Sequence, residues 1–146
     1  SLANMKGVSN GKVIDADKEY AVAEDYRKKL KTKCPSVEQN VGNLSGGNQQ
    51  KVLLAKWMFT EPDILILDEP TRGIDVGAKY EIYCIINDLV AAGKSVIMIS
   101  SELPEVLGMS DRIYIMNEGK FVGEVGKEEA TSELIMSKIV KSGKGA

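Results

Sequence analysis

Two adjacent carboxylates, Asp68 and Glu69, follow a short apolar run at residues 64–67. The run is continuous and shorter than a typical helix, which predicts a buried strand. In phosphoryl-transfer enzymes an aspartate holds the Mg²⁺ ion, and a neighbouring carboxylate can orient or deprotonate the attacking water. A buried strand would support such chemistry rigidly, because this catalysis depends on positioning and electrostatics. A plain strand end whose acids face solvent explains the same two residues, so a second feature is needed to decide.

Ser45, Gly46 and Gly47 stand at the start of a predicted helix. Glycine lets the backbone approach a phosphate closely, and a helix N-terminus offers N–H groups and partial positive charge to an anion. The Ser45 hydroxyl adds a further donor. The alternative is an ordinary helix cap after a glycine-rich turn.

Together these features resemble the ATP-binding cassette (ABC) ATPases, because the motifs of that family occur here in the family's order and spacing. The resemblance extends from about Tyr20 to Lys141. The matching segments are residues 44–51, similar to the ABC signature; 68–71, similar to the end of the Walker B motif; Asp75, at the D-loop aspartate; and 110–113, similar to the Asp-Arg segment after the switch loop.

Within the family, the chain is most similar to the ATP-binding subunits of bacterial ribose-type monosaccharide importers. Those subunits carry two cassettes in one polypeptide, and this chain looks like the C-terminal part of the second. Galactose- and xylose-type importers look similar as well. The segments that support this assignment are residues 44–51, 70–79 and 100–110.

The resemblance implies ATP and Mg²⁺ as cofactors and assigns roles to particular residues. Asp68 is expected near Mg²⁺ and Glu69 near the attacking water, both at the ATP of their own cassette. Ser101 takes the place of the family's switch histidine and is expected to act with Glu69. The residues expected at the ATP held by a partner cassette are Ser45, Gly46, Gly47, Asn48 and Asp75.

Three features depart from the family pattern. The chain shows no Walker A loop, since the segment 93–95 lacks the upstream glycine of that motif and precedes a strand. Asn48 stands where most signatures have glutamine, which keeps the amide on a shorter arm. Ser101 can hydrogen-bond a phosphate but cannot supply an imidazolium. The ATP site completed by Ser101 is therefore expected to hydrolyse slowly.

The resemblance implies that the parent chain is the ATP-hydrolysing component of a monosaccharide importer, with ribose as the expected sugar. The implied partners are the other cassette, transmembrane permease subunits and, indirectly, a periplasmic sugar-binding protein. The implied location is the cytoplasm, at the inner face of the plasma membrane. Without a Walker A loop, the chain by itself is expected to be inactive.

Two other classes of protein remain as alternatives. One is a soluble ABC-type ATPase of DNA repair or translation, and the other is a non-catalytic dimerisation module. The short helix predicted over residues 15–33 disfavours the repair proteins, in which long coiled coil precedes the signature. The carboxylates of the motif set, which make sense only beside a nucleotide, disfavour a pure dimerisation module.

The predicted helices and strands alternate along the chain, which indicates an α/β fold. With the resemblance, the expected fold is a partial P-loop NTPase (ABC/RecA-like) sheet with flanking helices that lacks the Walker A strand and loop. The predicted helices are 15–33, 45–59, 77–91, 104–109 and 131–141, and the predicted strands are 64–67, 96–99, 112–116 and 121–125. The domain boundaries are a loose lead-in at 1–14, a cassette part at 15–141 (signature helical region 15–60; Walker B, D-loop and switch region 61–141), and a disordered tail at 142–146.

In the family's sheet, the Walker A strand lies between the strands that correspond to residues 96–99 and 112–116. Two strand edges therefore lose their partner here. We expect either direct pairing across the gap or self-association through the exposed edges.

Composition bears on three further properties: nucleic-acid binding, cysteine chemistry and membrane-spanning helices. Nineteen basic and twenty-one acidic residues give a net charge of −2, which does not support nucleic-acid binding. The two cysteines, Cys34 and Cys84, match no metal-ligand spacing and are predicted to be unpaired thiols. No apolar run approaches the roughly 20 residues that a membrane-spanning helix requires.

Overall fold

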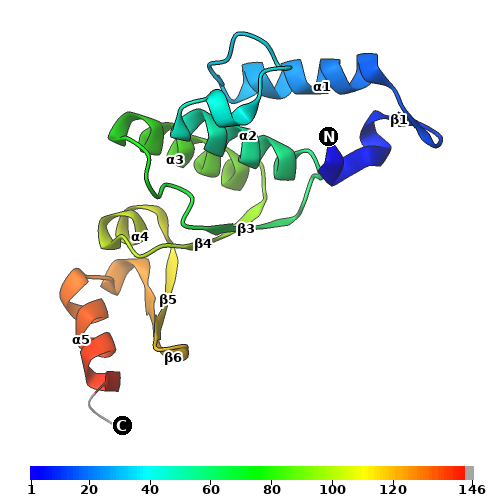
Figure 1. Ribbon diagram of the computed structural model, residues 1–146. Coiled ribbons are helices and arrows are strands. Elements are labelled where there is room, and N and C mark those ends of the chain that lie inside the picture. Colours follow the sequence, from blue (N-terminus) through cyan, green and yellow to red (C-terminus); the bar gives the residue numbers. More distant parts are fainter. Residues whose placement is uncertain (144–146) are drawn as a thin grey trace. The chain divides into compact units, whose positions relative to one another are not determined.

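Helices and strands alternate along the chain, as the α/β prediction requires. A computed structural model describes residues 1–143 (Figure 1) and divides the chain after Ile99 into two units. The first unit contains η1 (Leu2–Val8), β1 (Ser9–Asn10), β2 (Val13–Ile14), α1 (Ala16–Lys29), η2 (Val41–Asn43), α2 (Gly46–Met58), β3 (Ile64–Asp68), α3 (Val76–Ala91) and β4 (Ser95–Ile99). The second contains α4 (Leu103–Met109), β5 (Arg112–Asn117), β6 (Lys120–Gly126), η3 (Lys127–Glu129) and α5 (Ser132–Gly143).

The strands β3 and β4 form a parallel pair, with Ile64 opposite Ser95 and Asp68 opposite Ile99. Parallel neighbours need a crossover connection, and α3 supplies it and contacts β4. Helix α3 also contacts α2, which runs beside it (Figure 1). The buried side chains of this region are Leu54, Leu65, Leu67, Ile82, Ile85 and Ile86.

Strand β3 was predicted to be buried, and this is wrong for one of its faces, as it is for the same face of β4. Ile64, Ile66, Ile97 and Ile99, which we call the isoleucine face, are 50–63% exposed. Alternate residues of a strand point to opposite sides, so these four side chains share the side opposite Leu65 and Leu67. A parallel sheet is buried on both sides only when helices cover both. Within the described first unit, helices cover only one side of the pair.

Within each unit the described strands form separate two-stranded sheets, in which β4 pairs with β3 and β5 pairs with β6. The strands on either side of the gap, β4 and β5, belong to different units, so direct pairing across the gap stays a prediction. Self-association through the free edges stays a prediction.

The lead-in at residues 1–14 is ordered, contrary to the prediction of a loose segment. It forms the 3₁₀ helix η1 and a short hairpin of β1 and β2. Val8 is fully buried, and the Asn4 amide donates to the Phe59 carbonyl at 2.9 Å. Gly7 lies against the Phe59 ring, where an added Cβ would come within 2.7 Å of Cζ. The Asn4 hydrogen bond and the close Gly7 contact therefore attach this segment to the end of α2.

Helix α1 was predicted to run to residue 33 but ends at Lys29. Lys31 has a left-handed φ of 50°, and the Thr32 N–H donates to the Arg27 carbonyl at 2.9 Å. This backward bond satisfies a terminal carbonyl, as helix C-caps do. At the other end, Asp15 accepts hydrogen bonds from the backbone of the first turn, which confirms the predicted start.

The second unit is a hairpin packed by helices. Asn117 pairs with Lys120, and the two residues between them have φ of 47° (Glu118) and 75° (Gly119). A type I′ turn requires positive φ at both central positions, so a turn of this type joins the two strands. The core of this unit comprises Ile113, Ile115, Val125 and Ile135, with Leu103, Val106, Leu107, Val122, Ala130, Leu134 and Ile139 packed against it.

Helix α5 begins next to Thr131, as the sequence predicted. The Thr131 hydroxyl caps it by accepting from the Leu134 N–H at 3.1 Å. The helix continues to Gly143 rather than ending at Lys141. The predicted disordered tail therefore starts too early, and its residues 144–146 lie outside the described part. Within the described part, Cys34 and Cys84 are unpaired, as predicted.

Candidate functional site

A cleft of about 280 Å³ lies in the first unit where the N-terminal ends of α2 and α3 meet the segment that follows α1. We call it the α2–α3 cleft. Four of the five residues that the resemblance assigns to a partner's nucleotide line it. The full lining is Lys33, Ser45, Gly47, Asn48, Asp75, Gly77, Ala78 and Glu81.

Ser45 has the backbone conformation of an N-cap, with φ −61° and ψ 153°, but its hydroxyl makes no capping hydrogen bond within the described chain. The Asn48 amide donates to Ser45 Oγ at 2.9 Å instead. The Asn48 Oδ1 atom accepts from the Lys33 N–H at 2.8 Å. A hydroxyl has one proton to donate, and Asn48 uses Ser45 as an acceptor. The Ser45 proton can therefore be directed to an anion in the cleft.

The two glycines have unequal surroundings. Gly47 is buried, and an added Cβ would come within 2.5 Å of the Ala78 Cβ. A Cβ on Gly46 would lie 3.3 Å from the terminal Cγ2 of Ile74. Gly47 therefore allows α2 and α3 to approach closely. Sequence reasoning assigned it only to phosphate binding and missed this packing role.

Asp75 is the N-cap of α3, and its Oδ1 accepts from the Ala78 N–H at 3.0 Å. This bond satisfies one of the unpaired donors of the first turn. The favourable position of a carboxylate at a helix N-terminus offsets its negative charge. The motif aspartate thus both starts α3 and lines the cleft.

Beneath the cleft, a buried lysine joins α2 to α3. Lys51 is 2% exposed, and its Nζ lies 2.7 Å from Glu81 Oε2. It also donates to the Lys31 carbonyl at 3.2 Å. The hydrogen bond from Lys51 holds the pKa of the Glu81 carboxyl below its usual value, although partial burial opposes this shift. Sequence reasoning gave Lys51 no role, yet its spacing from the buried Gly47 and Leu54 could have placed it on the inner face of α2.

Asp68 and Glu69 lie at another place in the first unit, the C-terminal end of β3. The Asp68 side chain is exposed. Glu69 has a left-handed φ of 46°, and its N–H donates to the Ile99 carbonyl at 2.9 Å. Left-handed backbone is uncommon for residues other than glycine and often marks functional sites. The separation of these carboxylates from the cleft agrees with the resemblance, which assigns the two groups to different ATP molecules.

Ser101 belongs to the second unit, where it is exposed just before α4. Its neighbour Ser100 donates to the buried Glu105 carboxylate and accepts from the Glu102 N–H at 3.0 Å. Ser100 therefore fixes the start of α4, a role that the sequence did not predict.

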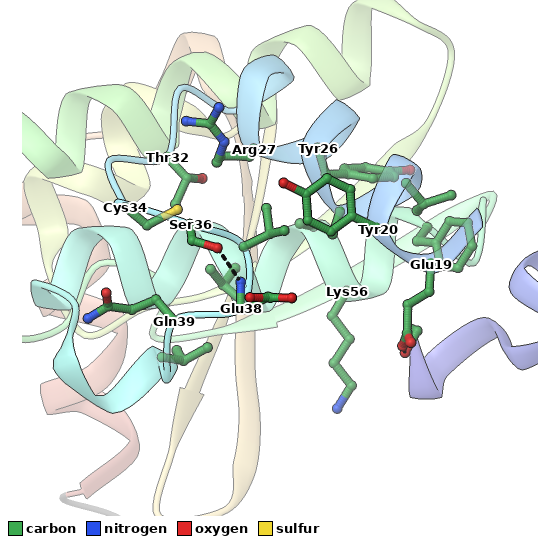
Figure 2. Close-up of a pocket in the computed structure, with 18 of the residues that line it drawn as sticks. Glu19, Tyr20, Tyr26, Arg27, Thr32, Cys34, Ser36, Glu38, Gln39 and Lys56 are labelled. Carbon is green, nitrogen blue, oxygen red and sulfur yellow. Dashed lines mark hydrogen bonds between the residues drawn. The ribbon is translucent and has the colours of Figure 1, made fainter. Parts of the chain in front are cut away.

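A larger hollow of about 480 Å³ lies between α1, α2 and the segment that joins them (Figure 2). Its walls are partly aromatic: Tyr26 and Phe59 meet edge to face at 6.0 Å, and Tyr20 lies nearby. On its polar side, Ser36 Oγ accepts from the Glu38 N–H at 3.1 Å. Among the motif segments only Leu44 lines this hollow, and the α2 residues that line it, Val52, Ala55 and Lys56, follow the motif. The candidate nucleotide residues therefore gather elsewhere.

Across residues 1–143, no group of three or more His, Cys, Asp or Glu side chains is arranged to hold a metal ion. None of the helices in that range is both long enough and apolar enough to cross a membrane.

Comparison with known proteins decides the family. A model described as "ABC transporter" matches residues 3–72. The L-arabinose transport ATP-binding protein of Geobacillus stearothermophilus is 60% identical over 97% of this chain. The chain belongs to the ABC transporter family. The xylose import ATP-binding protein of Geobacillus kaustophilus is 57% identical over 94% of the chain, and the ribose import ATP-binding protein of Clostridium tetani is 57% identical over 93%.

The chain spans only 27–28% of the length of these ABC relatives. Solved ABC cassettes share its fold. A nucleotide-free cassette is 27% identical with a TM-score of 0.75, and a cassette in its ADP conformation is 28% identical with a TM-score of 0.71. In each comparison 92% of this chain and 54% of the cassette are covered. The predicted fold class, a partial P-loop NTPase cassette, is confirmed.

Proposed function

We propose that the chain is part of the ATP-hydrolysing subunit of a bacterial ABC importer for a pentose. The observation that carries the proposal is the convergence of Ser45, Gly47, Asn48 and Asp75 on one cleft, away from the carboxylates at the end of β3. The relatives named for arabinose, xylose and ribose are nearly equally similar. Pentose import is therefore the proposal, and ribose stays the prediction from sequence.

The end of β3 would serve the ATP of the chain's own cassette. Mg²⁺ takes hard oxygen ligands and usually binds through one or two carboxylates together with phosphate oxygens. The exposed Asp68 carboxylate fits this requirement, and bound Mg²⁺ would supply charge neutralisation at the phosphates. Glu69, on a backbone fixed by its bond to Ile99, would orient the attacking water. Ser101 would contribute a hydroxyl to the γ-phosphate.

The α2–α3 cleft would receive the ATP held by the other cassette. Ser45 would donate its hydroxyl proton to a phosphate oxygen, and the N–H groups at the start of α2 would add donors. Gly46 keeps that approach open. Asn48 fixes Ser45, and Asp75 would line the contact between the cassettes.

We further propose that the two ATP sites are unequal, because Ser101 lacks the imidazolium of the family's histidine. The site completed by Glu69 and Ser101 would hydrolyse slowly, and the site completed by Ser45 would drive transport. In the full-length protein, Ser45→Arg should abolish sugar uptake, whereas Glu69→Gln should leave part of it. Loss of uptake in Glu69→Gln with normal uptake in Ser45→Arg would reverse the assignment.

The proposed partners are the other cassette, transmembrane permease subunits and, indirectly, a periplasmic sugar-binding protein, at the inner face of the plasma membrane. Calorimetry with Mg-ATP tests the proposed dependence on a Walker A loop. The chain alone should bind weakly or not at all, and the longer protein should bind. Tight binding by the chain alone would mean that its nucleotide site is not the one proposed. Sedimentation of the chain over a range of concentrations would test self-association through the β4 and β5 edges.

A further inference from the structure

One lysine lines the α2–α3 cleft outside every motif that the resemblance supplied. Of the described residues in the lining, Lys33 carries the only positive charge, and Asp75 and Glu81 carry negative charges. To bind a polyphosphate, the cleft must offset the negative charges of Asp75 and Glu81 and must also offer a positively charged donor to the ligand. The contacts of these three residues show how both requirements are met.

Both carboxylates already have partners of their own. Glu81 pairs with the buried ammonium of Lys51 at 2.7 Å. Asp75 caps α3 through the Ala78 N–H, where the helix N-terminus offsets its charge. Across residues 1–143 Lys33 forms no ion pair within 4 Å, although its charge adds to that of Lys51 in lowering the pKa of the Glu81 carboxyl. Its exposed ammonium group is therefore available to an incoming anion.

The backbone that carries Lys33 is held on both sides. Its own N–H donates to Asn48 Oδ1 at 2.8 Å, and Lys51 Nζ donates to the Lys31 carbonyl at 3.2 Å. Thr32, between these anchors, is only 7% exposed. The same Asn48 amide binds Ser45 Oγ, so one side chain sets the spacing between the Ser45 hydroxyl and the root of the Lys33 side chain.

We propose that Lys33 contacts the polyphosphate of the nucleotide held by the other cassette, and that Asn48 is its positioning residue. This inference rests on the function proposed above. A lysine–phosphate contact is a charge-assisted hydrogen bond, and its strength rises when the closing cassettes exclude water. The contact exists in both the bound ground state and the transition state, so it affects nucleotide affinity more than turnover.

The test uses the full-length, two-cassette protein and its Mg-ATP hydrolysis. Lys33→Gln removes the charge but keeps the backbone N–H that binds Asn48. It should raise KM for Mg-ATP about tenfold with kcat nearly unchanged. Lys33→Arg should restore most of the affinity. The matched control is Lys28→Gln, the same charge change on the exposed side of α1, which should leave KM as in the unaltered protein.

Asn48→Ala tests the positioning role. It should raise KM in the unaltered background. In the Lys33→Gln background the rise should be smaller, because coupled residues are not additive, and the part that remains reflects the bond from Asn48 to Ser45. Thermal unfolding of Lys33→Gln should match that of the unaltered protein. Additive effects of the two substitutions would overturn the positioning role.

Ser45→Arg in the same protein distinguishes a failure of the role proposed for Lys33 from a failure of the proposed function. If Ser45→Arg stops hydrolysis but Lys33→Gln behaves like Lys28→Gln, the role of Lys33 is refuted and the proposed function stands. If Ser45→Arg has no effect, the assignment of the cleft to a nucleotide is refuted as well.

Discussion

Replacing Gly47 by alanine should destabilise the first unit, although alanine is the better helix former. The added Cβ would lie 2.5 Å from the Ala78 Cβ, whereas non-bonded carbon atoms are most favourable at about 3.5–4.0 Å. The helices α2 and α3 would have to separate by about 1 Å. The Lys51–Glu81 pair joins the same two helices at 2.7 Å and would be strained by that movement.

The magnitude follows from two opposing effects. Overpacking a tight contact costs about 1–3 kcal/mol, and replacing a helical glycine by alanine returns about 0.5–1 kcal/mol. The net loss for Gly47→Ala is therefore about 1 kcal/mol, within a range of about 0–2.5 kcal/mol. Gly46→Ala is the matched control, because its Cβ would lie 3.3 Å from the Ile74 Cγ2 methyl group and 3.8 Å from the Gly73 carbonyl oxygen. That substitution should cost less than about 0.5 kcal/mol.

A compensating change makes the prediction specific to the contact. With Ala78→Gly, the nearest remaining atom to the new Cβ is the Ala78 Cα at 3.7 Å, an ordinary separation. The double variant Gly47→Ala/Ala78→Gly should therefore recover most of the lost stability. Urea unfolding of the chain, followed by far-ultraviolet circular dichroism, measures all four proteins. Equal stability of Gly47→Ala and the unaltered chain, or a double variant no more stable than Gly47→Ala, would refute the argument.

Three further predictions follow from contacts described above. Lys51→Met keeps the buried aliphatic part of the side chain and should lower the free energy of unfolding by about 1 kcal/mol. Lys51→Ala removes that part as well and should lower it by about 3 kcal/mol. Equal urea midpoints for the two variants would contradict the burial of the aliphatic part. Because the folded pKa of Glu81 is lowered, its ion pair stabilises the fold above its unfolded pKa of about 4.3 and is lost as pH falls through the folded value. Glu81→Gln should therefore flatten the acid limb of the stability–pH curve, and an unchanged limb would count against the pairing. Gly119→Ala, at φ 75°, should cost about 1 kcal/mol and speed hydrogen exchange in β5 and β6, whereas Gly126→Ala, at φ −77°, should change neither.

The candidate site was predictable from sequence where a motif has local causes. Ser45 was found because helix starts select such residues, and Asp68 and Glu69 were found because an apolar strand ends at them. Asp75 was found only through the resemblance to the family's D-loop. Their grouping into two places, one at the cleft and one at the end of β3, agrees with the roles that the resemblance implied.

The contacts that depend on distant segments were not predictable. The partnership of Lys51 with Glu81 requires α2 and α3 to lie side by side, and nothing in either helix alone indicates the partner. The attachment of the lead-in includes Val8, which is fully buried although the apolar residues Leu2 and Val13 of the same segment are exposed. The isoleucine face was predicted to be buried because a continuous apolar run shows that both faces of a strand are able to pack against other elements. The run does not show whether a helix or strand is present to pack against each face.

The left-handed backbone of Glu69 bears on how this protein would respond to selection. Such a conformation costs a residue with a side chain about 1–2 kcal/mol relative to glycine. A library selected only for folding or expression should therefore enrich glycine at position 69, whereas selection for sugar uptake should retain the carboxylate. Opposite enrichment in the two selections would show that the residue that favours activity at this position lowers the stability of the fold.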